Sequence, residues 1–159
     1  MTVNSESLRN AMHHWISGVV LVTVDDGTRK DGLTVSSFTS VTLEPPLILV
    51  CINKEWPTHD TIQRAGSFSV SFLAENQEAV CWNFASDDPD NRFDEITVTT
   101  SPAGHPIPDG CLATMDCIVA ASHSAGTHTV FIGEVVHIEE LSDGQPLIYF
   151  NQGFPKLAD

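Results

Sequence analysis

Positive charge is scarce in this sequence. The 159 residues include only seven Lys and Arg against 21 Asp and Glu, which gives a formal net charge of −14. A protein that binds the phosphate backbone of a nucleic acid needs a basic surface, and binding to an anionic membrane has the same requirement. Both classes of partner are therefore excluded. Any anionic cofactor has to be held by a few of these seven cations.

Long apolar stretches are also missing, since no run approaches the roughly 18 to 20 residues that a membrane-spanning helix needs. Residues 1–10 lack the basic start, apolar stretch and small-residue cleavage site of a secretory signal. We therefore expect a cytoplasmic protein. The length and a hydrophobic fraction of 42% fit one compact domain over residues 1–159.

The four cysteines form no CxxC pair and have no histidine at a zinc-ligand spacing, so no metal site is expected. We interpret them as reduced and mostly structural, and a regulatory disulfide between Cys111 and Cys117 is the alternative. The motifs GxGxxG, GxxxxGK[ST] and GxSxG are absent as well. Their absence argues against a Rossmann fingerprint, a P-loop and a serine nucleophile elbow.

Short β-type runs dominate what is present. Strands are expected at residues 19–24, 33–42, 47–53, 68–73, 111–123, 127–141 and 146–150, and helices near 8–16, 58–65 and 76–85. Gly18 and Gly66 are expected to end the first two helices. The polar segment SDDPDNRFDE is expected to be a mobile or partner-facing loop. This pattern predicts a mainly β barrel with a few short helices.

The segment DGLTVSSFTSVTLEPPL, residues 31–47, carries the clearest sign of a ligand. Small hydroxyl residues crowd an otherwise apolar strand, among them Thr34, Ser36, Ser37 and Ser40. Their hydroxyl and backbone N–H groups suit contacts with a flat polar ring. The alternative is an edge strand with Thr and Ser on its solvent face.

Several segments, in their order along the chain, resemble the flavin reductase-like family of FMN-binding split barrels. They are LRNAMHHWISGVVLVTV, GLTVSSFTSVTLEPPLILVCINK, RAGSFSVSFLAENQ, NFASDDPDNRF, GTHTVFIGEVVHIEEL and PLIYFNQGF. The resemblance implies an antiparallel Greek-key split β-barrel and a homodimer with the cofactor between its subunits. It also implies reduction of FMN or FAD by NADH or NADPH, with a flavin-dependent oxygenase component as a possible partner.

The resemblance further implies which residues bind the flavin. The residues expected to contact the isoalloxazine ring or the phosphate, or to form the rest of the flavin pocket, are Thr34, Val35, Ser36, Ser37, Ser40, Cys51, Ile52, Lys54, Thr58, Phe84, Arg92, Phe93 and Phe154. Lys54 and Thr58 match the pattern N-[KR]-x-S-x-T of the family's phosphate segment, although Trp56 replaces its serine. We expect Thr58 to cap the following helix, so that N–H groups of the helix face the anion.

Several of these assignments have a structural alternative. Lys54 is otherwise a solvated lysine, and Trp56 either stacks on a ring system or covers one end of the barrel. Phe154, where the family usually has tyrosine, is otherwise an anchor for the C-terminal tail. Arg92 either pairs with a phosphate or forms an ion pair with an acid of its own loop, the candidates being Asp87, Asp88, Asp90 and Asp94.

His128 is the residue expected to act on the nicotinamide side. It lies in GTHTVFIGEV, where the family usually has Gly-Asp-His, so Thr127 replaces the acid that would orient the imidazole. The alternative is a surface histidine. The implied reaction is hydride transfer to flavin N5, with the protein supplying orientation and electrostatics. A tightly flavin-bound redox carrier, a ferric reductase and a non-enzymatic flavin-binding module remain as other functions.

Overall fold

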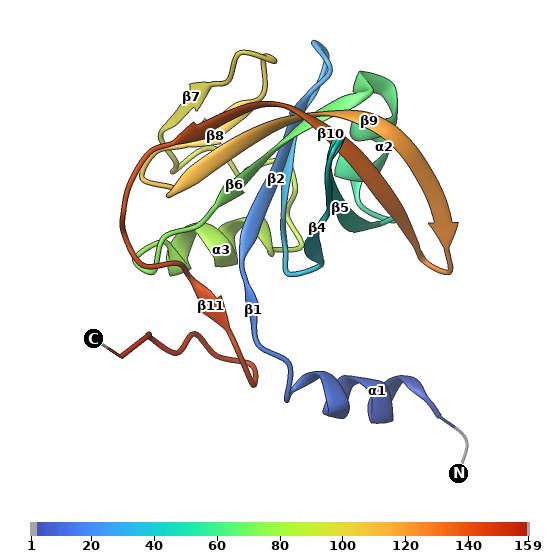
Figure 1. The fold of residues 1–159 in the computed structure, drawn as a ribbon, viewed down its shortest axis with the longest axis vertical. Coiled ribbons are helices and arrows are strands. Elements are labelled where there is room, and N and C mark those ends of the chain that lie inside the picture. The colour runs from blue at the N-terminus through green and yellow to red at the C-terminus, as the bar shows by residue number, and fades with distance from the viewer. Residues whose placement is uncertain (1–2, 159) are drawn as a thin grey trace.

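A curled antiparallel sheet forms the body of the protein in the computed structural model, which describes residues 3–158 (Figure 1). Its strand order is β3-β2-β6-β9-β10-β5-β4. The strands are β2 (Val20–Asp25), β3 (Lys30–Val35), β4 (Phe38–Leu43), β5 (Pro46–Asn53), β6 (Ser67–Phe72), β9 (Ala113–Ala125) and β10 (His128–Glu140). No helix of these described residues is long and apolar enough to cross a membrane.

The chain itself shows that the sheet curls. β3 and β4 follow one another in the sequence yet lie at opposite ends of the strand order. Only Ser36 and Ser37 separate them, and three residue steps span at most about 11 Å. The two edges of the sheet must therefore approach each other at this junction. The single strand expected over residues 33–42 is wrong, because the bend at these two serines divides it.

Alternating apolar residues give the barrel its core. Along β5, Ile48, Val50 and Ile52 are buried, and the residues between them are partly exposed. Val20 to Val24 of β2 are buried on both faces. Val20, Val22 and Val24 share the main core cluster with Ile62 of helix α2 (Pro57–Ala65), whereas Leu21 on the other face belongs to a smaller apolar cluster. α2 ends at Gly66, whose φ of 67° is left-handed. This confirms the helix end expected there.

The N-terminal segment lies apart from the barrel (Figure 1). Helix α1 (Ser5–Met12) begins at a capping box formed by Asn4 and Ser7 and buries no residue. The expected helix to residue 16 is therefore too long, and Gly18 does not end it. Instead, β1 (Ser17–Gly18) pairs with β11 (Ile148–Tyr149) near the C-terminus, and this pairing requires an extended backbone.

A small hairpin that the sequence did not reveal consists of β7 (Val98–Thr100) and β8 (Pro106–Pro108). Its contacts reach distant strands. The Thr23 hydroxyl donates to the carbonyl oxygen of Pro106 at 2.6 Å, and the Asp25 N–H donates to Nδ1 of His105 at 3.0 Å. Nε2 of His105 lies 2.9 Å from the Ser67 hydroxyl. Burial lowers the pKa of His105, which favours the neutral ring that these bonds require.

Candidate active site

A pocket of about 230 Å³ lies where β3 ends, next to helix α3 (Glu78–Phe84) and the C-terminal tail. Its lining consists of Val19, Thr34, Val35, Ser36, Cys81, Trp82, Ala85, Tyr149 and Phe154. Four residues assigned to the flavin from the sequence, Thr34, Val35, Ser36 and Phe154, are thus brought together here. The Thr34 hydroxyl donates to the carbonyl oxygen of Cys81 at 2.8 Å, which fixes the end of β3 against α3.

Aromatic rings form one side of this pocket. Phe154 lies edge-on to Trp82, with ring centroids 5.4 Å apart, and 5.7 Å from the ring of Tyr149. Tyr149 lies opposite Ser17 in the antiparallel β1–β11 pairing, and Tyr149 and Val19 both line the pocket. A pocket with aromatic groups on one side and a polar strand end on the other suits a flat heterocycle.

Ser37 and Cys51 contact each other across the β3–β4 junction. The Ser37 hydroxyl donates to the Cys51 carbonyl oxygen at 3.0 Å and accepts from the Cys51 N–H at 3.2 Å. Ile52 is fully buried in the core, and Ser40 is exposed on β4 opposite Ile48. These four predicted residues lie outside the pocket lining.

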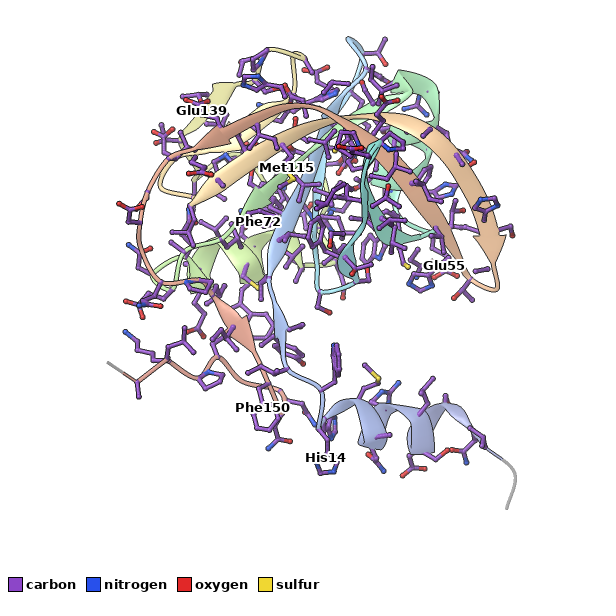
Figure 2. The ribbon with its side chains drawn as sticks, viewed as in Figure 1. His14, Glu55, Phe72, Met115, Glu139 and Phe150 are labelled. Atoms are coloured by element: carbon purple, nitrogen blue, oxygen red, sulfur yellow. The ribbon has the colours of Figure 1, made fainter. Side chains whose placement is uncertain are left out.

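Lys54 and His128 form a second group, at the tip of the β9–β10 hairpin. The Lys54 ammonium donates to the Ser124 hydroxyl at 2.8 Å and to the Gly126 carbonyl oxygen at 2.7 Å. His128 pairs with Asn53 on β5, and its Nδ1 lies 2.9 Å from the Thr127 hydroxyl. Thr127 therefore supplies a polar partner to the imidazole of His128. Glu55, next to Lys54, marks this end of the barrel in Figure 2.

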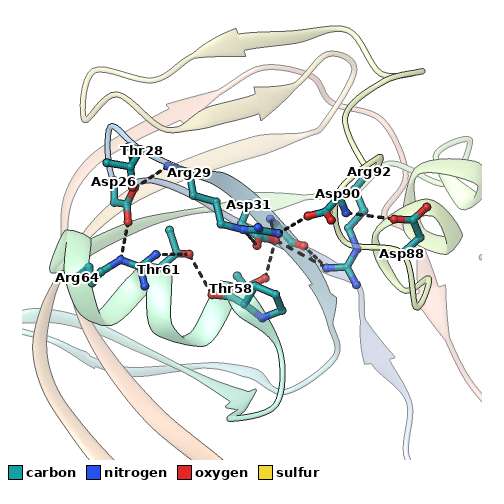
Figure 3. A network of polar contacts seen from close by, with 12 residues as sticks. Asp26, Thr28, Arg29, Asp31, Thr58, Thr61, Arg64, Asp88, Asp90 and Arg92 are labelled. Atoms are coloured by element: carbon teal, nitrogen blue, oxygen red, sulfur yellow. Dashed lines mark hydrogen bonds and ion pairs between the residues drawn. The ribbon is translucent and has the colours of Figure 1, made fainter.

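Arg92 lies inside the protein, and Figure 3 shows it on the right of a polar network that has Asp31 near its middle. Its side chain is fully buried, and it donates to the carbonyl oxygens of Gly32 at 2.7 Å and Ser86 at 2.5 Å. The guanidinium lies 3.9 Å from the Asp31 carboxylate and 5.1 Å from the Trp56 ring centroid. Within residues 3–158, the ion pair of Arg92 is thus with Asp31 on β3 and not with an acid of its own loop.

Asp31 is a buried charged residue that sequence reasoning did not single out. The carboxylate is fully buried and accepts from the Arg29 Nε at 2.8 Å, the Gly32 N–H at 2.7 Å and the Thr58 hydroxyl at 2.9 Å. Thr58 is itself buried within α2, whose N-cap is Trp56, so the expected capping by Thr58 is wrong. Trp56 packs against the barrel core. This agrees with the interpretation that it covers one end of the barrel.

Phe84 and Phe93 are packing residues beneath the pocket. Phe84 is fully buried and lies edge-on to Phe93, with centroids 4.9 Å apart. The Lys30 ammonium is 4.6 Å from the centroid of the Phe93 ring. Both rings belong to the smaller apolar cluster that includes Val19 and Cys81. They shape the pocket from below.

The cysteines are free thiols, and no disulfide joins Cys111 to Cys117. Burial raises the pKa of Cys81 to about 11 and that of Cys117 to about 12. Because the thiolate is the reactive form, Cys81 contributes a neutral, weakly polar surface to the pocket and no nucleophile.

Comparison with known proteins decides the family. Residues 12–158 match the flavin reductase like domain. The chain belongs to the flavin reductase-like family. The reductase subunit HsaB of a flavin-dependent monooxygenase from Rhodococcus jostii is 37% identical over 93% of this chain and 75% of its own length. The FMN reductase (NADH) SmoA of Agrobacterium fabrum is 34% identical, over 98% of this chain and 87% of its own.

A solved structure agrees with this membership of the flavin reductase-like family. It is the NADH:FAD oxidoreductase SgcE6 of Streptomyces globisporus, in complex with NAD and FAD fragments. Its TM-score is 0.92 at 30% identity, with coverage of 99% of this chain and 97% of that one. The predicted antiparallel split barrel is confirmed.

The described residues of this flavin reductase-like chain fit a flavin. The pocket offers an aromatic side and the polar end of β3 to a planar ring. Lys54 presents an exposed ammonium whose protein partners are a hydroxyl and a carbonyl oxygen, and no carboxylate of residues 3–158 pairs with it. Arg92 and Thr58, in contrast, use their polar groups inside the protein.

Proposed function

We propose that this chain is an NAD(P)H-dependent flavin reductase that binds FMN or FAD non-covalently and supplies reduced flavin to a separate oxygenase component. The pocket between the end of β3 and the aromatic side carries this proposal. Support also comes from relatives named as NADH-dependent flavin reductases and as monooxygenase reductase subunits. The four free cysteines suit a reducing cytoplasm, where we propose that it acts.

The chain contributes orientation to this reaction. A bound flavin supplies the hydride acceptor, and the nicotinamide cofactor supplies the hydride. Tyr149, Trp82 and Phe154 offer an aromatic surface to a planar ring, and the Thr34 bond to Cys81 fixes the end of β3 against α3. Two rings held in contact react as a unimolecular pair, which is the main contribution that positioning makes to catalysis.

Steady-state oxidation of NADH and NADPH with FMN, FAD and riboflavin tests the function. We expect turnover with at least FMN or FAD, and a preference for NADH, because four of the seven cations already pair with carboxylates and few remain for a 2′-phosphate. Absence of oxidation above background with every flavin would contradict the proposal. A stoichiometric yellow colour after purification would favour the tightly bound redox carrier instead.

We further propose that the protein acts as a homodimer. Helix α1 buries no residue, and Leu8, Trp15 and Ile16 of the N-terminal segment are all more than half exposed, at 58%, 65% and 55%. Val136 and Ile138 expose a similar share on β10, at 53% and 54%. Apolar area of this extent commonly marks a protein interface. Sedimentation at twice 17.3 kDa would support the dimer, and a monomer at micromolar concentration would contradict it.

Lys54→Ala is expected to weaken the binding of FMN about ten- to a hundredfold and the binding of riboflavin much less. The reason is the loss of a charge-assisted hydrogen bond to phosphate, worth roughly 1.5 to 3 kcal/mol. Fluorescence titration of both flavins measures the difference. Glu55→Ala, the exposed neighbour, is the control for local disturbance. Equal weakening of FMN and riboflavin by Lys54→Ala would place the ammonium away from the phosphate.

His128→Ala is expected to raise KM for NADH or slow flavin reduction by a few-fold to tenfold, with flavin affinity nearly unchanged. A hydrogen bond to a neutral amide contributes about 0.5 to 1.5 kcal/mol. His128 does not line the pocket at the end of β3, which we call the ring pocket. Stopped-flow reduction together with flavin titration separates the two effects. Loss of flavin binding would assign His128 to the flavin instead, and unchanged NADH kinetics would make it a bystander.

A further inference from the structure

A second pocket, of about 320 Å³, lies between α1 and the turn after β11. It is lined by Arg9, Met12, His13, Tyr149, Asn151 and Gln152, which come from the two ends of the chain. Figure 2 shows this region below the barrel, where His14 and Phe150 are labelled. Its lining holds one guanidinium and two side-chain amides, and none of the described residues that line it carries a carboxylate.

Each side of the pocket is formed by residues that are close together in the sequence. Arg9 and Met12 are three residues apart on one face of α1, and His13 follows as the C-cap of this helix. On the other side, two 3.0 Å backbone hydrogen bonds between Phe150 and Gly153 close a two-residue turn. Asn151 and Gln152 occupy this turn, and the Gln152 amide lies 2.8 Å from Nε2 of His13. The turn and the helix are therefore in direct contact.

Arg9 differs from the other cations of the protein in the partners of its side chain. Four of them pair with carboxylates, namely Arg29, Arg64, Arg92 and Lys156. Lys54 bonds to the β9–β10 tip and Lys30 lies over Phe93. Between residues 3 and 158, Arg9 has no ion-pair partner. In a chain of net charge −14, a guanidinium beside two amide side chains is suited to bind an anion.

Tyr149 connects this anion pocket to the ring pocket, because it lines both. A molecule whose anionic group lies in the second pocket is therefore positioned to reach the first pocket, where we place the isoalloxazine. We propose that Arg9, with the Asn151 and Gln152 amides, binds the diphosphate of the nicotinamide dinucleotide while its nicotinamide reaches the flavin. This inference rests on the proposed function. Lys54, which we assign to the flavin phosphate, lies at the hairpin tip and leaves Arg9 free for the second cofactor.

The test is Arg9→Gln, compared with Lys156→Gln. Each variant removes one exposed cation, but Lys156 lies outside the pocket, 3.7 Å from Glu75. We expect Arg9→Gln to raise KM for NADH about five- to twentyfold, as for a solvent-exposed charge-assisted bond, and to leave FMN affinity unchanged. Calorimetric titration of flavin-free protein with NAD⁺ and with ADP-ribose should show the same loss. Lys156→Gln should change none of these values by more than about twofold.

Three results would overturn the inference. The first is equal behaviour of the two variants toward NADH and ADP-ribose. The second is a loss of FAD affinity in Arg9→Gln with NAD⁺ and FMN unchanged, which would assign the pocket to the diphosphate of FAD. The third is a wild-type protein that oxidises NADH with flavin but binds ADP-ribose no better than Arg9→Gln does. Failure of the proposed function differs from all three, since the wild type would then oxidise no NADH with any flavin.

Discussion

Replacing Asp31 with alanine is expected to lower the free energy of unfolding by about 3 to 5 kcal/mol, because a buried cation would lose its counter-charge. Arg92 and Asp31 are both fully buried. Arg92 would keep its bonds to the Gly32 and Ser86 carbonyl oxygens, but it would lose the carboxylate that pairs with it, and the Thr58 hydroxyl would lose its acceptor. Total stabilities are only about 5 to 15 kcal/mol, so this variant is expected to be partly unfolded under mild conditions.

Urea unfolding followed by circular dichroism measures the loss, and Asp90→Ala is the matched control. Asp90 also pairs with Arg29, at 2.9 Å, but 74% of its side chain is exposed. An exposed pair of this kind contributes about 0 to 1 kcal/mol. Asp31→Asn, which keeps the size and one acceptor, should fall between the two. Similar losses in Asp31→Ala and Asp90→Ala would show that burial of the Arg92 charge does not depend on Asp31.

The strands and helices predicted from sequence are those that local pattern determines. Alternation along residues 47–53 places Ile48, Val50 and Ile52 on one face, and the structure buries all three. Gly66 ends α2 because only a residue without a Cβ adopts a left-handed φ at little cost. Such signals lie within a few residues of the element that they define.

The elements that were missed or misplaced depend on distant residues. The β7–β8 hairpin bonds to Thr23 and to the Asp25 N–H, about eighty positions away in the sequence. The first helix ends at Met12, and Gly18 pairs with Ile148 in an extended strand instead of ending the helix. Apolar periodicity in residues 8–16 gave no indication of that strand. In each case a tertiary contact overrides the local preference.

The candidate site divides in the same way. The hydroxyl-rich strand end at Thr34 and Ser36 was evident from residue types and from the family resemblance, and both residues line the pocket. Asp31 is one acid among 21, and no local pattern distinguishes a buried carboxylate from an exposed one. The second pocket joins Arg9 to Gln152, and the β1–β11 pairing and the contact between Gln152 and His13 bring those two distant segments together.

Ser36→Trp is expected to reduce flavin affinity by about a hundredfold or more while the fold remains stable. Ser36 is exposed at the mouth of the ring pocket, so an indole there has room in the unliganded protein and occupies the space that the isoalloxazine needs. Overpacking costs roughly 1 to 3 kcal/mol even where neighbours can move, and a ring kept out of the pocket loses most of its binding energy.

Fluorescence titration with FMN and riboflavin measures the effect of Ser36→Trp, and thermal unfolding verifies the fold. The binding of both flavins should weaken equally, because the substitution blocks the site of the ring that they share. Lys54 at the hairpin tip is left unchanged. Ser142→Trp, which adds the same side chain at an exposed loop position outside the pocket, should bind both flavins as the wild type does. If Ser36→Trp kept wild-type affinity, the isoalloxazine would have to bind elsewhere, and the aromatic side formed by Trp82, Tyr149 and Phe154 would serve another purpose.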